Sequence, residues 1–263
     1  MKQGLIALCL VIGLLSCSPS APAPVTIAIN PWPGYALLYL AQQQDFFEQT
    51  GANIKLLQFS SLADAQRAYL NGEVDGLAST LVEAVQSQVL GRNPLKIVMV
   101  PDYSNGGDVV IASRSIASIK ELKGKTIGCE VTSLGIYLLQ RALVKSGLTL
   151  SDVRVVNVEQ ADGYSALSRG RIDALVTYPP VSVQMLKNDN YHMIFSSADI
   201  PTEIIDVVSL SEQALKNNPQ IVKQLHQAWD LAIDYYHQNP SQAAAIMVES
   251  LKVSADDFLI LTF

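Results

Sequence analysis

The amino-acid sequence presents the same succession of features twice, with the second copy about 100 residues after the first. Residues 26–51 and residues 126–147 each pass from an alternating apolar stretch, through a loop with a glycine, into an amphipathic stretch. Residues 53–80 and 153–178 each add an apolar stretch, a short amphipathic stretch and the pattern Gly-x-[Val/Ile]-Asp. Because alternation predicts strands and three-to-four spacing predicts helices, each copy is a β-α-β-α-β unit. The period is too long for a solenoid and predicts two similar α/β lobes, each a sheet with helices on both faces.

Two segments, residues 96–114 and 196–211, link the copies. We therefore expect the chain to cross between the lobes twice and to form a hinge of two strands. The predicted boundaries give lobe one residues 25–102 together with 200–263, and lobe two residues 103–199.

Two pairs of residues recur at matching places in the copies. Gly72 and Gly170 stand at the C-terminal ends of predicted helices, where a left-handed conformation favours glycine. Asp75 and Asp173 open the next short strand in each copy, and we interpret both as structural residues.

The first residues of the chain are typical of a secretory signal. Lys2 is followed by an apolar run of 12 residues, Gly4 to Leu15, which is too short for a membrane span. The sequence Leu-Leu-Ser-Cys that ends at Cys17 resembles a bacterial lipobox, in which the cysteine receives a lipid. This pattern predicts a lipoprotein signal at residues 1–16, a tether at residues 17–24, and a protein anchored to a bacterial membrane in the periplasm or at the cell surface. The alternative is an ordinary signal with an incidental cysteine.

Charge and cysteine content limit the classes of function. The formal net charge is −6 and no run of Lys or Arg occurs, so we expect no nucleic-acid partner. Removal of the signal leaves Cys17 and Cys129, so we expect no internal disulfide. Cys129 lies on an apolar strand, which favours a small core residue over a nucleophile.

Motifs for catalysis and metal binding are absent from the sequence. His192, His226 and His237 are not at metal-ligand spacing, and HExxH, CxxC, GxSxG and P-loop patterns do not occur. We therefore expect no metal, no cofactor and no enzymatic activity. The main rival interpretation is an enzyme, and turnover of the ligand would distinguish it.

Five short segments, in their order along the chain, resemble the nitrate/sulfonate/taurine class of substrate-binding proteins of ABC importers. They are WPGY, SNGGD, SIKELKGKTIG, GRIDALVTYPP and IPTEIIDV. The resemblance covers nearly all of residues 25–263 and implies the type II periplasmic binding protein fold. It also implies a small-molecule ligand, a membrane permease with a separate ATPase as partner, and a chain that we expect to be monomeric. Members of the class usually continue for several more helices, so the apolar run ADDFLILTF at residues 255–263 either packs on lobe one or marks a shorter chain.

In α/β folds, ligands bind where the carboxyl ends of strands meet, so the predicted site is a cleft between the lobes. In lobe one, Trp32 and Tyr35 follow the first strand on a turn that Pro31 and Pro33 stiffen, and we expect this turn to be exposed at the lip of the cleft. The alternative is that Trp32 packs under the loop as core. The third strand of the same lobe ends in Ser79 and Thr80, which are further candidates.

Lobe two offers Thr132, Ser133 and Tyr178 at equivalent strand ends. Ser133 can cap the helix that follows it, and the free N–H groups there suit an anion, although capping alone also explains the residue. In the first crossing, Asn105 and Asp108 are candidate ligand contacts, and the alternative for this glycine-rich stretch is a flexible hinge turn.

These residues predict a small organic anion or a zwitterion, such as an amino-sulfonate, as the ligand. Asp108, and with it Glu130, would favour an amine, whereas hydroxyl and backbone donors would favour an anion. No Arg or Lys stands at these strand ends, so a phosphate fits poorly. The alternatives are a thiamine-precursor or flavin binding protein, an enzyme of cofactor biosynthesis on the same fold, or a sensory lipoprotein that binds another protein.

Overall fold

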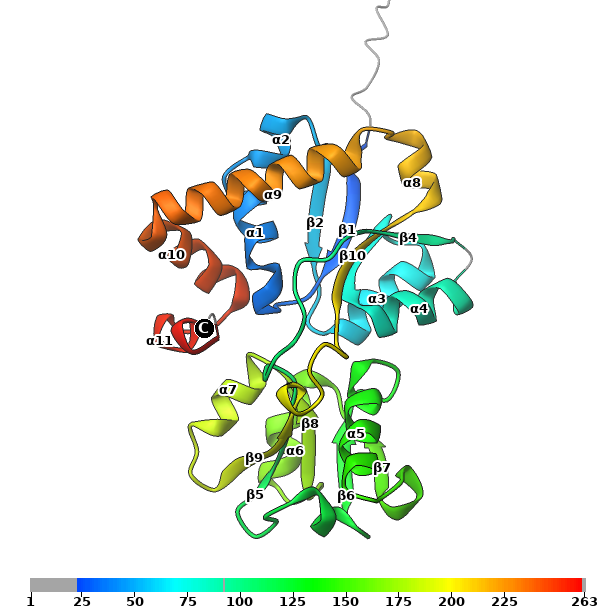
Figure 1. The fold of residues 1–263 in the computed structure, drawn as a ribbon, viewed down its shortest axis with the longest axis vertical. Coiled ribbons are helices and arrows are strands. Elements are labelled where there is room, and N and C mark those ends of the chain that lie inside the picture. Colours follow the sequence, from blue (N-terminus) through cyan, green and yellow to red (C-terminus); the bar gives the residue numbers. More distant parts are fainter. Residues whose placement is uncertain (1–22, 92, 262–263) are drawn as a thin grey trace, which may run out of the picture.

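The structure is a computed structural model that describes residues 23–91 and 93–261, and it consists of two lobes (Figure 1). Lobe one contains a five-stranded sheet in the order β2-β1-β3-β10-β4. Its strands are β1 (Val25–Ile29), β2 (Ile54–Gln58), β3 (Gly76–Thr80), β4 (Leu95–Met99) and β10 (Asp206–Ser211). Strand β10 is antiparallel to both of its neighbours, whereas β1 is parallel to β2 and β3.

Lobe two repeats this arrangement, with the strand order β7-β6-β8-β5-β9. Its strands are β5 (Val109–Ser113), β6 (Thr126–Cys129), β7 (Arg154–Asn157), β8 (Ala174–Thr177) and β9 (Tyr191–Ser196). Strand β5 is antiparallel to β8 and β9, and therefore takes the place that β10 takes in lobe one. The predicted pair of similar α/β lobes is confirmed.

Helices cover both faces of each sheet (Figure 1). One face of the lobe-one sheet carries α1 (Ala36–Gln43), α2 (Phe46–Thr50), α9 (Ile221–Gln238) and α10 (Pro240–Leu251), and the other carries α3 (Leu62–Asn71) and α4 (Leu81–Leu90). One face of the lobe-two sheet carries α5 (Leu134–Lys145), and the other carries α6 (Gly163–Ser168) and α7 (Val181–Leu186). The remaining helices are α8 (Glu212–Asn217) and α11 (Ala255–Leu261), and short 3₁₀ turns lie at Pro33–Tyr35, Ile119–Leu122, Leu150–Asp152, Gln160–Asp162 and Ser197–Asp199.

The two copies match in the detail of their hydrogen bonds. Asp75 accepts hydrogen bonds from the Thr26 N–H and hydroxyl, both at 2.9 Å, and so ties the start of β3 to β1. Asp173 accepts a bond from the Thr126 N–H at 2.8 Å and ties β8 to β6 in the same way. The structural interpretation of both aspartates is therefore confirmed.

The chain crosses between the lobes after β4 and again after β9 (Figure 1). The two crossings lie against each other, because Tyr103 of the first forms an antiparallel bridge with Ile205 of the second. This is the predicted hinge of two strands. The lobe boundaries that we drew within the crossings stay predictions.

Several predictions concern the N-terminal segment and the cysteines. The signal at residues 1–16 and the lipidation of Cys17 lie outside the described residues, as does most of the tether. Cys129, the last residue of β6, is a free cysteine with no exposed surface, and it lies in the core. Within residues 23–91 and 93–261, no helix has both the length and the apolar character needed to cross a bilayer.

Candidate functional site

The lobes contact each other directly, and the closest contact joins α4 to the N-terminus of α5. The Oε1 atom of Glu83 accepts hydrogen bonds from the Ser133 hydroxyl at 2.8 Å and from the Leu134 N–H at 2.6 Å. Its other oxygen accepts bonds from the Thr80 hydroxyl and N–H, which completes a capping box on α4. One fully buried carboxyl group therefore caps two helices, one from each lobe.

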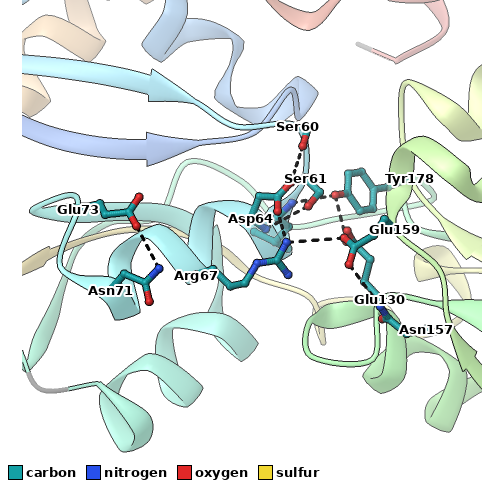
Figure 2. Close-up of polar contacts among 11 residues, drawn as sticks. Ser60, Ser61, Asp64, Arg67, Asn71, Glu73, Glu130, Asn157, Glu159 and Tyr178 are labelled. Carbon is teal, nitrogen blue, oxygen red and sulfur yellow. Dashed lines mark hydrogen bonds and ion pairs between the residues drawn. The ribbon is translucent and has the colours of Figure 1, made fainter.

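A second contact runs in the opposite direction, from lobe two to the N-terminus of α3. The Tyr178 hydroxyl accepts a hydrogen bond from the Leu62 N–H at 3.0 Å and lies 3.4 Å from Oε2 of Glu130. At the edge of the same contact, Arg67 of α3 reaches Glu159 of lobe two at 3.9 Å (Figure 2). Because Arg67 is half exposed, this ion pair contributes little to stability.

Between these contacts lies a cavity of about 10 Å³, the size of one water molecule. Residues of both lobes and of the crossings line it, namely Asn30, Trp32, Tyr35, Leu62, Thr80, Asp108, Leu134, Tyr178 and Asp206. A second cavity of similar size adjoins it and includes Asp108, Glu130, Gln160 and Tyr178 among its lining residues. We call these two cavities the inner cleft. Any ligand larger than a few atoms requires the lobes to separate.

The aromatic side chains of the inner cleft come from both lobes. Trp32 and Tyr178 meet edge to face, with ring centroids 6.3 Å apart and an angle of 77° between the rings. Trp32 is only 7 % exposed, so the predicted exposed turn at the lip is wrong. The turn is buried because lobe two and the first crossing close over it, and proline rigidity alone does not place a turn in solvent.

Two glycines allow the crossing to approach the Trp32 turn. A side chain on Gly34 would overlap the Asp102 carboxyl group, and one on Gly107 would overlap the Trp32 ring. Glycine at both positions therefore places Asp102 and Trp32 in the wall of the cleft.

The carboxyl groups of the cleft are buried without a basic partner. Tyr35 donates a hydrogen bond of 2.6 Å to Asp206, and burial together with the nearby Asp102 raises the pKa of Asp206 well above its usual range. Burial also raises the pKa of Asp108 to about 7, against hydrogen bonding from Ser104. Burial is also the main reason that the pKa of Glu130 is raised to about 7.

A wider outer cleft of about 580 Å³ opens beside the inner cleft, between the first crossing and α7. Asn105 is exposed there, and the exposed side chains of Tyr103, Leu186 and Met193 also line it.

The structure brings most of the predicted site residues together. Those that line the inner cleft are Trp32, Tyr35, Thr80, Asp108 and Tyr178. The others lie elsewhere. Ser79 is buried in β3 and donates its hydroxyl to the Thr80 carbonyl, Thr132 is exposed, and the Ser133 hydroxyl is bound to Glu83.

Sequence reasoning missed Asn30, Glu83, Asp102 and Asp206. A signal for Asp206 was present, because Asp-Val-Val occurs at Asp108 and again at Asp206, the two places where the chain enters β5 and β10. Nothing local marks Glu83 as a contact between lobes, since its spacing from Thr80 is that of a capping box.

The chain is similar in sequence to several known binding proteins. It is 31% identical to a putative binding protein of Brucella abortus over 156 residues. This match covers 56% of this chain and 47% of that protein. It is 25% identical to the taurine-binding periplasmic protein of Escherichia coli, over 74% of this chain and 61% of that protein. The match thus spans about half to three fifths of the length of these curated relatives.

Among solved structures, the periplasmic aliphatic sulphonate binding protein of Escherichia coli has the same fold, with a TM-score of 0.75 at 18% identity. The match covers 92% of this chain and 83% of that protein. The resemblance expected from the sequence is thereby confirmed at the level of fold and class. The family model described as NMT1/THI5 like matches residues 32–243, and the chain belongs to this family.

Proposed function

We propose that this chain is the solute-binding component of an ABC importer, and that it captures a small organic molecule between its two lobes. The observation that carries the proposal is the inner cleft, because residues of both lobes line one small cavity beside a hinge of two crossings. A ligand that contacts both lobes only when they are closed stabilises the closed form by the difference in its affinity for the two forms.

The proposal includes the partners and the location expected from the sequence. The closed lobes would dock on a membrane permease driven by a separate ATPase. A lipid on Cys17 would hold the protein, as a monomer, at a bacterial membrane in the periplasm or at the cell surface. Lobe one would comprise residues 25–102 and 200–263, and lobe two residues 103–199.

A thermal-shift screen of the purified protein tests the binding function. The panel contains taurine, alkanesulfonates, nitrate, pyrimidine precursors of thiamine, and riboflavin. A ligand at about a hundred times its dissociation constant adds roughly 2.7 kcal/mol to the free energy of unfolding, which raises the Tm by several degrees. A rise for one solute class supports the proposal, and a sharp transition that no solute shifts counts against it.

Two further measurements separate the rival functions. An enzyme would convert the bound solute, whereas a binding protein returns it unchanged, so recovery of the solute after incubation distinguishes the two. A sensory lipoprotein would leave solute uptake intact when its gene is deleted, whereas loss of an importer component abolishes uptake. The ligand class expected from the sequence, an anion or a zwitterion, stays a prediction.

A further inference from the structure

The helix N-terminus that suits an anion is filled by a carboxyl group of the protein. The Ser133 hydroxyl and the Leu134 N–H, the first free donors of α5, both point to Oε1 of Glu83. Glu83 has no exposed surface and is held by Thr80 on its other oxygen. A sulfonate could bind these donors only by displacing Glu83.

Carboxyl side chains line the inner cleft, and no basic side chain is among the described residues that line it. Asp108, Glu130 and Asp206 are each at most 5% exposed. No Lys, Arg or His is among the residues that line the inner or the outer cleft. An anion there would meet several acidic groups and no opposite charge, which disfavours its charged form.

Unpaired acceptors also surround the inner cleft. Among the described residues, the buried atoms without a hydrogen-bond partner include one donor, the indole N–H of Trp32, and two acceptors, Oδ1 of Asn30 and Oε1 of Glu130. The side chains of Asn30 and Glu130 are 2% and 5% exposed. Asn30 lines the first cavity and Glu130 the second. A buried acceptor without a donor is costly, so these atoms call for a ligand that donates hydrogen bonds. A sulfonate has no donor, whereas an ammonium group has up to three.

The apolar part of the cleft also suits a cation. The rings of Trp32 and Tyr178 meet edge to face at the cavity, beside Leu62 and Leu134. Aromatic faces attract a cation through the ring quadrupole, and the leucines offer an apolar surface to the rest of the molecule.

We propose that the solute captured in the inner cleft is a small organic cation, whose protonated nitrogen lies between Asp108 and Asp206 and whose apolar body lies against Trp32 and Tyr178. This inference rests on the proposed binding function and replaces the anion or zwitterion expected from the sequence. Asn30 and Glu130 accept hydrogen bonds from the same nitrogen or from a second donor on the ligand. Burial has raised the pKa of Asp108 and of Glu130 to about 7, and a bound cation would lower both again.

Matched probes test the charge of the ligand. Ethyl, cyclohexyl and benzyl compounds are each titrated calorimetrically into the full protein as the amine, the alcohol and the sulfonate, together with every solute from the screen above that shifts the Tm. We expect at least one amine to bind, at least tenfold tighter than the alcohol of the same size, and no sulfonate to bind. A sulfonate that binds tighter than its amine overturns the inference.

The variant Asp108→Asn gives a second test, which applies to any solute that binds. It replaces a carboxyl group by an amide of the same shape, so a cationic solute should lose at least tenfold in affinity, whereas an anionic solute should gain. Glu130→Gln, as a second variant, should lower the affinity for a cation in the same direction. The control Asp234→Asn, on the exposed face of α9, should change nothing.

The outcomes separate the two proposals. An affinity that is unchanged or higher in Asp108→Asn overturns the cationic ligand and leaves the binding function standing. If no probe and no solute of the screen binds, the binding function fails, and the inference fails with it.

Discussion

Asp108 and Asp206 occupy similar positions, because Asp108 directly precedes β5 and Asp206 is the first residue of β10, and these two strands take the same place in their sheets. Both are buried at the cleft, and neither has a basic neighbour among the residues that line it. A buried carboxyl group without a cation is held in its protonated form. The protonation state of Asp108 and Asp206 therefore depends on the pH and on the charge of any bound solute.

The first prediction concerns the pH dependence of stability. Asp108 faces Glu83 and Asp102, with Asp206 also nearby, and its pKa rises from 3.8 in the unfolded chain to about 7 in the folded protein. The folded state therefore holds a proton that the unfolded state releases, so the free energy of unfolding falls as the pH rises from about 4 to about 7. At 1.36 kcal/mol per pKa unit, this single group contributes about 4 kcal/mol to that fall.

Asp108→Asn removes this contribution. Its free energy of unfolding, measured by denaturant titration between pH 4 and pH 8, should fall less steeply with pH than that of the wild type, and the variant should be the more stable protein at pH 8. The residual slope comes from the other buried carboxyl groups with raised pKa values, namely Glu130, with a pKa of about 7, and Glu83, Asp102 and Asp206. Parallel pH profiles for the two proteins would show that Asp108 is ionised in the folded state.

The second prediction concerns the approach of the first crossing to the Trp32 turn. Gly34→Ala places a methyl group where the Asp102 carboxyl group lies, so one of the two must move. Overpacking of this kind costs about 1–3 kcal/mol, which thermal unfolding would detect as a lower Tm. Gly124→Ala and Gly147→Ala cannot serve as controls. Both glycines have a positive φ, of 75° and 78°, which strains any other residue. Ser115→Ala, at an exposed position of lobe two, is the matched control and should leave the Tm unchanged.

At the scale of single residues, the sequence predicts the site in part. Trp32, Tyr35, Thr80 and Tyr178 follow from the rule that strand ends face the ligand, because this rule depends only on the order of elements. Asp108 was predicted from its place in the glycine-rich first crossing. Sequence reasoning missed Glu83, because its role depends on a tertiary contact. Its spacing from Thr80 indicates a capping box and gives no sign of the contact with the other lobe.

At the scale of elements, helices α4 and α5 meet end to end through Glu83, although about 50 residues separate this side chain from Leu134. The same carboxyl group accepts hydrogen bonds from both helices, while burial raises its pKa. This contact, the one between Tyr178 and α3, and the ion pair of 2.7 Å between Lys187 and Asp257 join the lobes, so all three must break when the cleft opens.

The third prediction follows from the contact at α5. Glu83→Ala leaves the N-terminal donors of α5 and the Thr80 N–H without their acceptor, so the closed form loses stability relative to an open form in which water reaches those donors. Small-angle X-ray scattering should report a larger radius of gyration for the variant than for the wild type. Asp234→Asn serves as the control and should scatter as the wild type does. An unchanged radius for Glu83→Ala would show that this contact does not keep the lobes closed.

The element order was the part of the fold that the sequence predicted best. The repeat of β-α-β-α-β units leads directly to two sheets of equivalent order, and β10 and β5 fill the same place because both follow a crossing. Helices α4 and α7 also occupy equivalent places, because each directly follows the third strand of its copy. The closeness of the lobes could not be predicted, because periodicity describes each lobe separately and gives no information about the contact between them.

At the scale of the whole molecule, the apolar core runs from one lobe into the other. A single cluster of buried side chains includes Ile27 and Leu38 in lobe one, Trp32 and Tyr178 at the cleft, and Leu138 in lobe two. Opening the lobes therefore exposes apolar surface as well as the two helix N-termini. A solute that fills the cleft must replace these contacts, which favours a ligand with both an apolar body and a group that donates hydrogen bonds.

The central claim is that the solute binds between the lobes, and the fluorescence of Trp32 tests it most directly. The chain has two tryptophans, Trp32 in the cleft and Trp229 on α9, so the variant Trp229→Phe leaves Trp32 as the single tryptophan emitter. Titration of this variant with a solute that raises the Tm should change the emission with saturation, at the dissociation constant that calorimetry gives. Binding by calorimetry with no change in Trp32 emission would place the solute outside the cleft and contradict the account.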